Sequence, residues 1–385
     1  MSLPRPPFTA SPVQVWAVED RAIQVIWGHL PEGPVTLEAR GSSGGLNRPI
    51  GHVTEHHAGG PGLLELDALP PSTELTLELS WRGGTRTLTT RTDDPTPGDE
   101  LFRFATISDV HLGAVHWGFL KTMIDRQAHL HDDPYPLRCG RAALAEAAAW
   151  GAQLLVIKGD LVQHRNTVNF NQAGLLIDEF PELPMLLIPG NHDVDLVESD
   201  MALPLLGQRQ LAYTQSAAAE DVPGARVIVA NSAIPGAGRG TLETGHEQIL
   251  DLARCDRPVF VAVHHHFQRY GTMTHWPPGI GKAEADRFFR ELHRANPRAL
   301  VTSGHSHRNR QRLHHGVTFS EVGSTKDWPG VWGGYVVHEG GIRQTVRKTR
   351  AMVEWHEYSR GAVFGAWGLW SPGRPGERCF SLNWG

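Results

Sequence analysis

The chain has 385 residues, of which 40% are apolar and 20% are charged, and its formal net charge at pH 7 is -5. This composition excludes a disordered or fibrous protein, and at roughly 100–200 residues per domain the length predicts two domains. The slight acidic excess argues against nucleic acid as a partner, because sequence-independent binding to nucleic acid depends on many basic residues.

Histidine and cysteine counts indicate which kind of metal site to expect. The sequence holds 22 His but only 3 Cys, and Cys139, Cys255 and Cys379 form no closely spaced pair. This spacing indicates neither a disulfide framework nor a thiolate zinc site. A metal site in this chain is therefore expected to use nitrogen and oxygen ligands.

The N-terminal residues show no secretion signal, because no apolar run follows Arg5. No stretch of the chain approaches 18 continuous apolar residues. We therefore expect no membrane span and a cytoplasmic location.

Residues 1–98 are expected to form an all-β domain. Apolar and polar residues alternate with a period of two in six short segments, which are separated by Gly and Pro: 13–18, 22–28, 34–40, 62–69, 74–81 and 85–92. This spacing is typical of a β-sandwich, with a β-barrel of similar size as the alternative. The stretch 66–92 resembles the closing half of a fibronectin type III domain.

Residues 99–350 are expected to form a second, α/β domain after an acidic, Pro-containing linker at 93–100. Buried strands are predicted at 102–109, 154–160, 185–193, 226–232, 258–266 and 299–307, and helices at 140–150, 171–180, 243–254 and 282–295. Three further segments, at 317–324, 333–339 and 341–348, are predicted to be antiparallel strands. Residues 351–385 are expected to be a Trp-rich tail that packs on this domain, with a dimer contact or a substrate wall as alternatives.

Polar side chains follow the predicted buried strands where each strand ends. They are Asp109 and His111, then Asp160, then Asn191, His192 and Asp193, then His264, and finally His305 and His307. In open α/β sheets, ligands bind beyond the carboxyl ends of the strands, so these side chains are expected to converge on one site.

The residue types in this set favour a two-metal centre. Two divalent ions about 3.5–4 Å apart can hold the attacking and leaving oxygens of a phosphoryl displacement, and a carboxylate can bridge them. Asp109 and His111 would share one face of an extended segment, as positions i and i+2 do. His305 and His307 would either share a face or be sent by a turn to different ions. Glycines 159, 190 and 304 are expected to have positive φ and to let the backbone approach the ions closely.

Five short motifs in this order resemble the calcineurin-like metallophosphoesterase superfamily over roughly residues 102–345. The motifs are DVH at 109–111, GD at 159–160, GNHD at 190–193, HHH at 264–266 and GHSH at 304–307. The resemblance implies a four-layer αββα sandwich and two divalent metal ions, Mn, Fe or Zn. It also implies hydrolysis of a small-molecule phosphate ester by a metal-bridging hydroxide.

Carried over residue by residue, the resemblance implies two ligand sets and a bridge. Asp109, His111 and His307 would hold one ion, Asn191, His264 and His305 would hold the other, and Asp160 would bridge them. His192 would act on the substrate as a proton donor or by stabilising charge. Asp193 would either orient that imidazole or cap the next segment. Among the three consecutive histidines His264 is the expected ligand, His265 would face the opposite way, and His266 replaces a common proline and could reach substrate.

Three functions are open at this point. The motif order is most similar to class III cyclic nucleotide phosphodiesterases and glycerophosphodiesterases, which favours a phosphodiester substrate. The alternative is a phosphomonoesterase with the architecture of purple acid phosphatases, although Gln163 stands where those enzymes have a metal-binding Tyr. A non-catalytic interaction protein is the second alternative. The insert at 114–138, with His129 and His131, is a candidate for a lid or for a homodimer contact.

Overall fold

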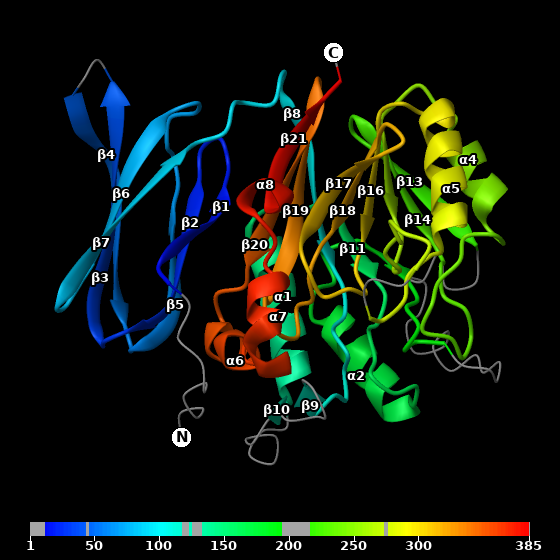
Figure 1. Cartoon of the computed structure of the whole chain (residues 1–385), viewed down its shortest axis with the longest axis horizontal. Coiled ribbons are helices and arrows are strands. Elements are labelled where there is room, and N and C mark those ends of the chain that lie inside the picture. The colour runs from blue at the N-terminus through cyan, green and yellow to red at the C-terminus, as the bar shows by residue number, and fades with distance from the viewer. Residues whose placement is uncertain are drawn as a thin grey trace.

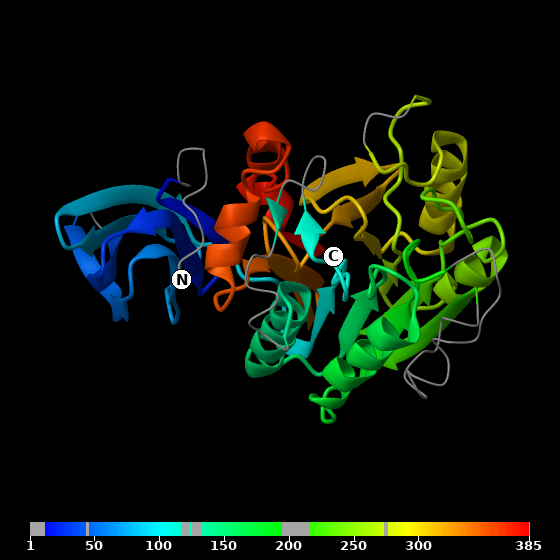
Figure 2. The ribbon, with the colours of Figure 1, turned by 90° about the horizontal axis from the view of Figure 1, so that it is seen from below.

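A computed structural model describes residues 12–43, 46–117, 123–124, 133–194, 216–272 and 276–384. Figure 1 shows an elongated molecule in which a β-sandwich at the N-terminal end stands beside a larger body of two sheets and several helices. Figure 2 shows the two parts from below, with the C-terminal helices lying between the sandwich and the larger body. The histidines at 129 and 131, predicted to lie in a loop, fall outside the described residues.

The N-terminal part consists of two stacked antiparallel sheets. One contains β1 (Gln14–Val18), β2 (Ile23–Leu30) and β5 (Gly60–Leu66), and the other contains β4 (Leu46–His57), β3 (Gly33–Ser43), β6 (Glu74–Trp81) and β7 (Gly84–Arg91). Val25, Leu37 and Leu77 meet between the sheets and are completely buried. The two sheets remain separate, so the structure is a sandwich and the barrel alternative is wrong.

Strand β4 was not predicted from the sequence. This strand pairs only with β3 at the edge of its sheet, and most of its side chains from residue 50 onward are partly or fully exposed. An edge strand whose inner face is only partly buried carries little alternation of apolar and polar residues, so its sequence lacks the period-two signal.

The larger part is built on two six-stranded sheets. The first has the order β12 (Met185–Ile188), β11 (Leu155–Lys158), β8 (Glu100–Ile107), β19 (Val331–His338), β20 (Gly341–Lys348) and β21 (Cys379–Asn383). The second has the order β13 (Ala217–Val222), β14 (Ala225–Ala230), β15 (Val259–Ala262), β16 (Ala299–Ser303), β18 (Val317–Glu321) and β17 (Arg310–His314). A short hairpin of β9 (His116–Trp117) and β10 (Met123–Ile124) stands apart. Phe104, Phe260 and Tyr335 pack ring against ring between the two large sheets, at centroid distances of 4.8–4.9 Å.

Helices cover the outer faces of both large sheets. The helices α1 (Tyr135–Ala149) and α2 (Thr167–Asp178) share an apolar core with the first sheet, and α4 (His246–Ala253) and α5 (Lys282–Ala295) share one with the second. The predicted four-layer αββα arrangement is therefore confirmed. Helix α2 starts earlier than its apolar pattern indicates, because the side chain of Asn166 accepts a hydrogen bond from the Asn169 N–H and caps the helix there.

The segment at 317–324 was wrongly grouped with the two antiparallel strands that follow it. Strand β18 lies in the other sheet, parallel to β16 and antiparallel to β17, whereas β19 and β20 form a hairpin next to β8. Alternation along a strand shows that one face is buried but not which neighbour it pairs with. Strand β21, which adds a strand from the tail to the edge of the first sheet, was not predicted, because its partly exposed side chains give little alternation.

Residues 351–384 lie on the larger part of the molecule and also approach the sandwich. They form α6 (Val353–Ser359), the short 3-10 helix η4 (Val363–Gly365), α7 (Ala366–Trp370), α8 (Pro375–Arg378) and β21. The ring of Trp355 stacks on Tyr135 of α1 at 3.9 Å between centroids, and Arg378 lies over Trp16 of the sandwich at 4.2 Å. Within the described residues, no helix is long and apolar enough to cross a membrane.

Candidate metal centre

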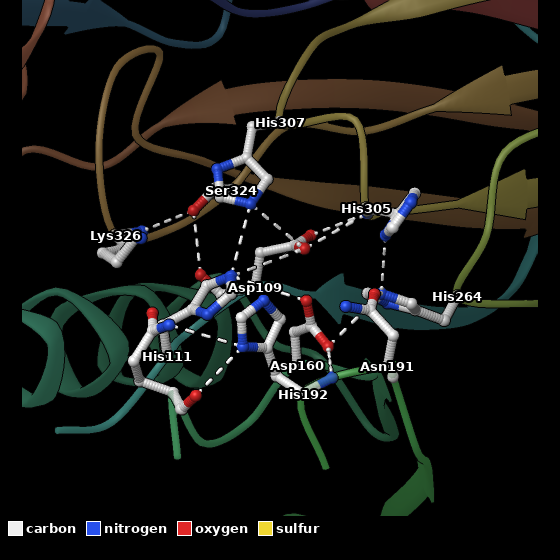
Figure 3. A network of polar contacts seen from close by, with 12 residues as sticks. Asp109, His111, Asp160, Asn191, His192, His264, His305, His307, Ser324 and Lys326 are labelled. Atoms are coloured by element: carbon white, nitrogen blue, oxygen red, sulfur yellow. Dashed lines mark hydrogen bonds and ion pairs between the residues drawn. The ribbon is translucent and has the colours of Figure 1, made fainter. Parts of the chain in front are cut away.

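The loops that follow β8, β11, β12, β15 and β16 bring the predicted site residues together at one end of the two sheets (Figure 3). Seven of these residues are buried, with relative exposures from 0 to 7%: Asp109, His111, Asp160, Asp193, His264, His305 and His307. Asn191 and His192 are partly exposed. The strand-end positions therefore converge as the sequence pattern predicted.

The backbone at the site is held in an uncommon conformation. Five residues have positive φ, between 50° and 64°: Asp109, His111, Asp160, His305 and His307. Left-handed conformations cost about 1–3 kcal/mol each in non-glycine residues, and they cluster at functional sites. Asp109 and His111 themselves have left-handed backbone conformations. The expectation that they share one face of an extended segment was therefore wrong.

One group of ligand atoms lies around Asp109. The His307 Nε2 is 3.3 Å from the Asp109 Oδ1 and also 3.3 Å from the His111 Nε2. The His111 Nε2 in turn lies 4.0 Å from the same carboxylate oxygen. These three atoms could all contact one ion.

A second group lies around His264. Its Nε2 is 3.2 Å from the Asn191 Oδ1 and 3.1 Å from the His305 Nδ1. His305 and His307 therefore point to different groups, as one of the two alternatives for this motif required.

Asp160 lies between the two groups and turns one carboxylate oxygen to each. Its Oδ2 is 3.6 Å from the His111 Nε2, and its Oδ1 is 3.4 Å from the His264 Nε2. The Oδ1 also accepts a hydrogen bond from the His192 N–H at 2.9 Å. Asp160 is thus in the position required for a bridge between the two groups.

Three of the imidazoles use their second nitrogen to donate a hydrogen bond away from the cluster. The His264 Nδ1 donates to the Lys158 carbonyl oxygen at 2.7 Å, and the His305 Nε2 donates to that of Pro278 at 3.2 Å. The His307 Nδ1 donates to the Asp327 carboxylate at 3.4 Å. In the neutral form of each ring, the remaining nitrogen carries a lone pair that faces the cluster, which is the arrangement of histidines that ligate metals.

The carboxylates make the pocket attractive to cations. Burial alone would lower the pKa values of His264 and His307, but Asp160 and Asp109 outweigh it and raise both to about 9. The pKa of His305 instead falls to about 3, because of burial and the nearby His264. Two carboxylates and several imidazoles with inward lone pairs fit divalent cations, which would replace the protons on His264 and His307.

The glycines at the site have two separate roles. Gly159 has φ of +86°, as predicted, but Gly190 and Gly304 do not have positive φ. A Cβ atom at Gly190 would lie 2.2 Å from the Asp160 Oδ1, and one at Gly304 would lie 2.5 Å from the Ser108 Oγ. Gly190 and Gly304 are therefore needed for close packing and not for a left-handed backbone.

His192 lies beside the cluster with its ring edge to His111, at 4.8 Å between centroids. Its Nδ1 donates to the carbonyl oxygen of Gln163 at 2.9 Å, so the Nε2 is left for a ligand in the site. Asp193 does not contact this ring. Its buried carboxylate accepts hydrogen bonds from the N–H groups of Leu161, Val162 and Gly190, so Asp193 joins the loops that follow β11 and β12. The segment that it was expected to cap continues outside the described residues.

The two histidines after His264 are buried and pack against the ring of His305. The Nδ1 of His265 lies 2.9 Å from the Ser232 Oγ, and its ring lies 4.5 Å from that of His305 between centroids. His266 is 2% exposed and stacks on the ring of His305 at 5.6 Å. His266 thus packs against a site histidine, and whether it contacts a substrate stays a prediction.

Three residues that hold the site together were not predicted from the sequence. Lys158 is fully buried, and its Nζ donates to the Ser303 carbonyl oxygen at 2.8 Å. The Ser324 Oγ donates to the Asp109 carbonyl oxygen at 2.9 Å, and Asp327 accepts from His307. Lys158 could have been noticed, because a lysine within an apolar strand is unusual. Nothing near Asp327 in the sequence indicates its contact with His307, twenty positions earlier.

A model of the calcineurin-like phosphoesterase family matches residues 102–309, more than half of the chain. This chain therefore belongs to the calcineurin-like phosphoesterase family. Members of the family use a dinuclear divalent metal centre, and the residues assembled here fit such a centre through their donor atoms and the orientation of their imidazoles.

The chain is also similar to a protein of Psychrobacter arcticus described as a probable cyclic nucleotide phosphodiesterase. The two are 26% identical over 186 residues, which cover 45% of this chain and 63% of the relative. The chain thus matches less than two thirds of the length of that relative.

Two solved structures have a similar arrangement at low sequence identity. PhoD is 12% identical and has a TM-score of 0.46, with 89% of this chain and 88% of that chain covered. The purple acid phosphatase PPD1 of yellow lupin is 13% identical and has a TM-score of 0.47, with 88% and 72% covered.

Proposed function

We propose that this protein is a metal-dependent phosphoesterase that hydrolyses a small-molecule phosphodiester, such as a cyclic nucleotide or a glycerophosphodiester. The observation that carries the proposal is the position of Asp160, whose two oxygens face two separate groups of ligand atoms. Membership of the phosphoesterase family supports the hydrolase activity, and the description of the Psychrobacter arcticus relative favours a diester.

The proposed ligands follow the two groups. Asp109, His111 and His307 would hold one divalent ion, Asn191, His264 and His305 would hold the other, and Asp160 would bridge them. All the donor atoms are nitrogen or oxygen, a set that suits Mn, Fe or Zn. When bound, the two ions would acidify a water molecule and neutralise negative charge on the phosphate.

His192 is the residue proposed to act on the substrate directly. It is partly exposed, and its Nδ1 is occupied by the Gln163 carbonyl oxygen, which fixes the ring with its Nε2 available. A proton held on that Nε2 can be donated to the leaving oxygen, or it can stabilise charge on a phosphate oxygen. Gln163 contacts this imidazole at 3.3 Å and lacks the phenolate that an iron–tyrosinate centre requires.

The experiment that tests the proposal compares two synthetic substrates with the purified protein after loading with Mn²⁺. We expect bis-p-nitrophenyl phosphate, a diester, to be cleaved faster than p-nitrophenyl phosphate, a monoester. Faster cleavage of the monoester would support the phosphomonoesterase alternative. Two bound ions without turnover of either substrate would instead support the non-catalytic alternative.

A further inference from the structure

The loop between β18 and β19, residues 322–330, contacts the metal centre although it lies beyond the part of the chain matched by the family model. In this loop the Ser324 Oγ donates to the carbonyl oxygen of Asp109 at 2.9 Å (Figure 3). Asp327 is fully buried, and its Oδ1 accepts the hydrogen bond from the His307 Nδ1. The loop thus contacts two of the three residues proposed to hold one ion.

The Trp-rich tail holds this loop by four hydrogen bonds to its backbone. The Trp355 Nε1 donates to the Lys326 carbonyl oxygen at 2.6 Å, and the His356 Nε2 donates to that of Thr325 at 2.9 Å. The Ser359 Oγ accepts from the Trp328 N–H at 2.8 Å, and the Trp367 Nε1 donates to the Trp328 carbonyl oxygen at 2.7 Å. These bonds lie on both sides of Asp327.

The four hydrogen bonds to the loop backbone are important because the Asp327 side chain has few polar contacts of its own. Its Oδ2 accepts no hydrogen bond within the described residues and has only an ion pair with the Lys326 Nζ at 3.5 Å. A buried polar group is fixed mainly by its partners, so the backbone on either side must determine where this carboxylate lies. Figure 1 shows α6 and α7, which supply the four side chains, next to each other in the lower half of the molecule, near α1.

We infer that Asp327 is a positioning residue for His307 and that the tail fixes Asp327 through the loop. A carboxylate that accepts from a ligating imidazole sets the orientation of the ring and raises its basicity as a ligand. The affinity for the ion at Asp109, His111 and His307 therefore depends on side chains at 355, 356, 359 and 367. This inference rests on the proposed function, because it takes His307 as a metal ligand.

The direct test measures Mn²⁺ binding to Asp327→Ala and Asp327→Asn by isothermal titration calorimetry. We expect Asp327→Ala to bind one of its two ions about 10–100-fold more weakly and the other with unchanged affinity. Asp327→Asn should lose less, because its amide oxygen still accepts from the imidazole. Unfolding of each metal-free variant, followed by circular dichroism, reports any general loss of stability. Wild-type affinity for both ions in Asp327→Ala would overturn the inference.

The contribution of the tail is tested with Trp355→Phe and Trp367→Phe, which remove the indole N–H but keep an aromatic ring. We expect the same ion to be weakened, by a smaller factor than in Asp327→Ala. Trp384→Phe is the matched control, since this tail residue packs against the core between the sheets and not against the loop. If Trp355→Phe and Trp367→Phe bind both ions as tightly as Trp384→Phe does, the role of the tail is overturned.

The outcomes also separate this inference from the proposed function. A wild-type protein that binds two ions but cleaves no phosphate ester would contradict the proposed function. The role of Asp327 would then still be decided by the Mn²⁺ affinities of its variants. A wild-type protein that binds no Mn²⁺, Fe²⁺ or Zn²⁺ would overturn both.

Discussion

The N-terminal sandwich and the metal-centre loops use buried side chains in opposite ways. Between residues 12 and 91 the described part of the chain buries Gln24 as its only polar side chain, and the rest of that core is apolar. The segment 108–111 alone buries Ser108, Asp109 and His111. Apolar burial stabilises the sandwich, whereas the loops hold charged groups and strained backbone that cost stability. We therefore expect substitutions in the two regions to affect different properties.

The largest loss of activity is expected for Asp160→Ala, which tests whether one carboxylate joins the two groups of ligand atoms. Removal of both oxygens should lower metal occupancy below two ions per chain, and hydrolysis should fall by at least about 10⁴-fold, because the two ions act together. Metal analysis and a turnover assay measure the two effects. Two fully bound ions in this variant would contradict the bridging position.

His192→Ala is expected to separate catalysis from metal binding within the same site. The His192 side chain belongs to neither ligand group, so both ions should remain, while loss of a proton donor should slow turnover by about 10²–10⁴-fold. The measurement is kcat together with metal content, and unchanged turnover would refute a catalytic role for this imidazole.

Metal affinity is expected to increase with pH, because the metal-free pocket holds protons that the ions displace. The pKa values of His264 and His307 are about 9, raised by Asp160 and Asp109 against the effect of burial. Below pH 9 each ring must release a proton, so affinity should rise by up to about tenfold per pH unit for each proton displaced and level off above it. Calorimetry between pH 6 and 10 measures this, and an affinity independent of pH would contradict it.

The smallest effect on activity is expected for Leu77→Ala in the sandwich. Leu77 is completely buried, so its truncation should lower the free energy of unfolding by about 2–5 kcal/mol. Metal content and kcat at a temperature where the chain is folded should stay at the wild-type values. Chemical denaturation with a parallel assay measures both, and a parallel loss of metal would show that the two regions are not independent.

Much of the fold could be predicted from local patterns. The helix at 282–295 has the predicted bounds, and the predicted strands at 102–109 and 299–307 begin close to where the observed strands do. Strand β4 and strand β21 could not be predicted, since partly exposed edge strands carry weak alternation. The placement of β18 in the second sheet was also missed, because pairing partners are not encoded in alternation.

The sequence by itself determined which polar residues follow the strands and in what order. Asp109, Asp160 and His264 each follow a strand, and parallel strands bring their carboxyl ends to a common edge, so chain order is sufficient to predict convergence. Only the tertiary structure decided that Asp193 joins two loops and that His307 donates a hydrogen bond to Asp327. Such contacts join residues from separate loops, and their geometry depends on packing that no local pattern records.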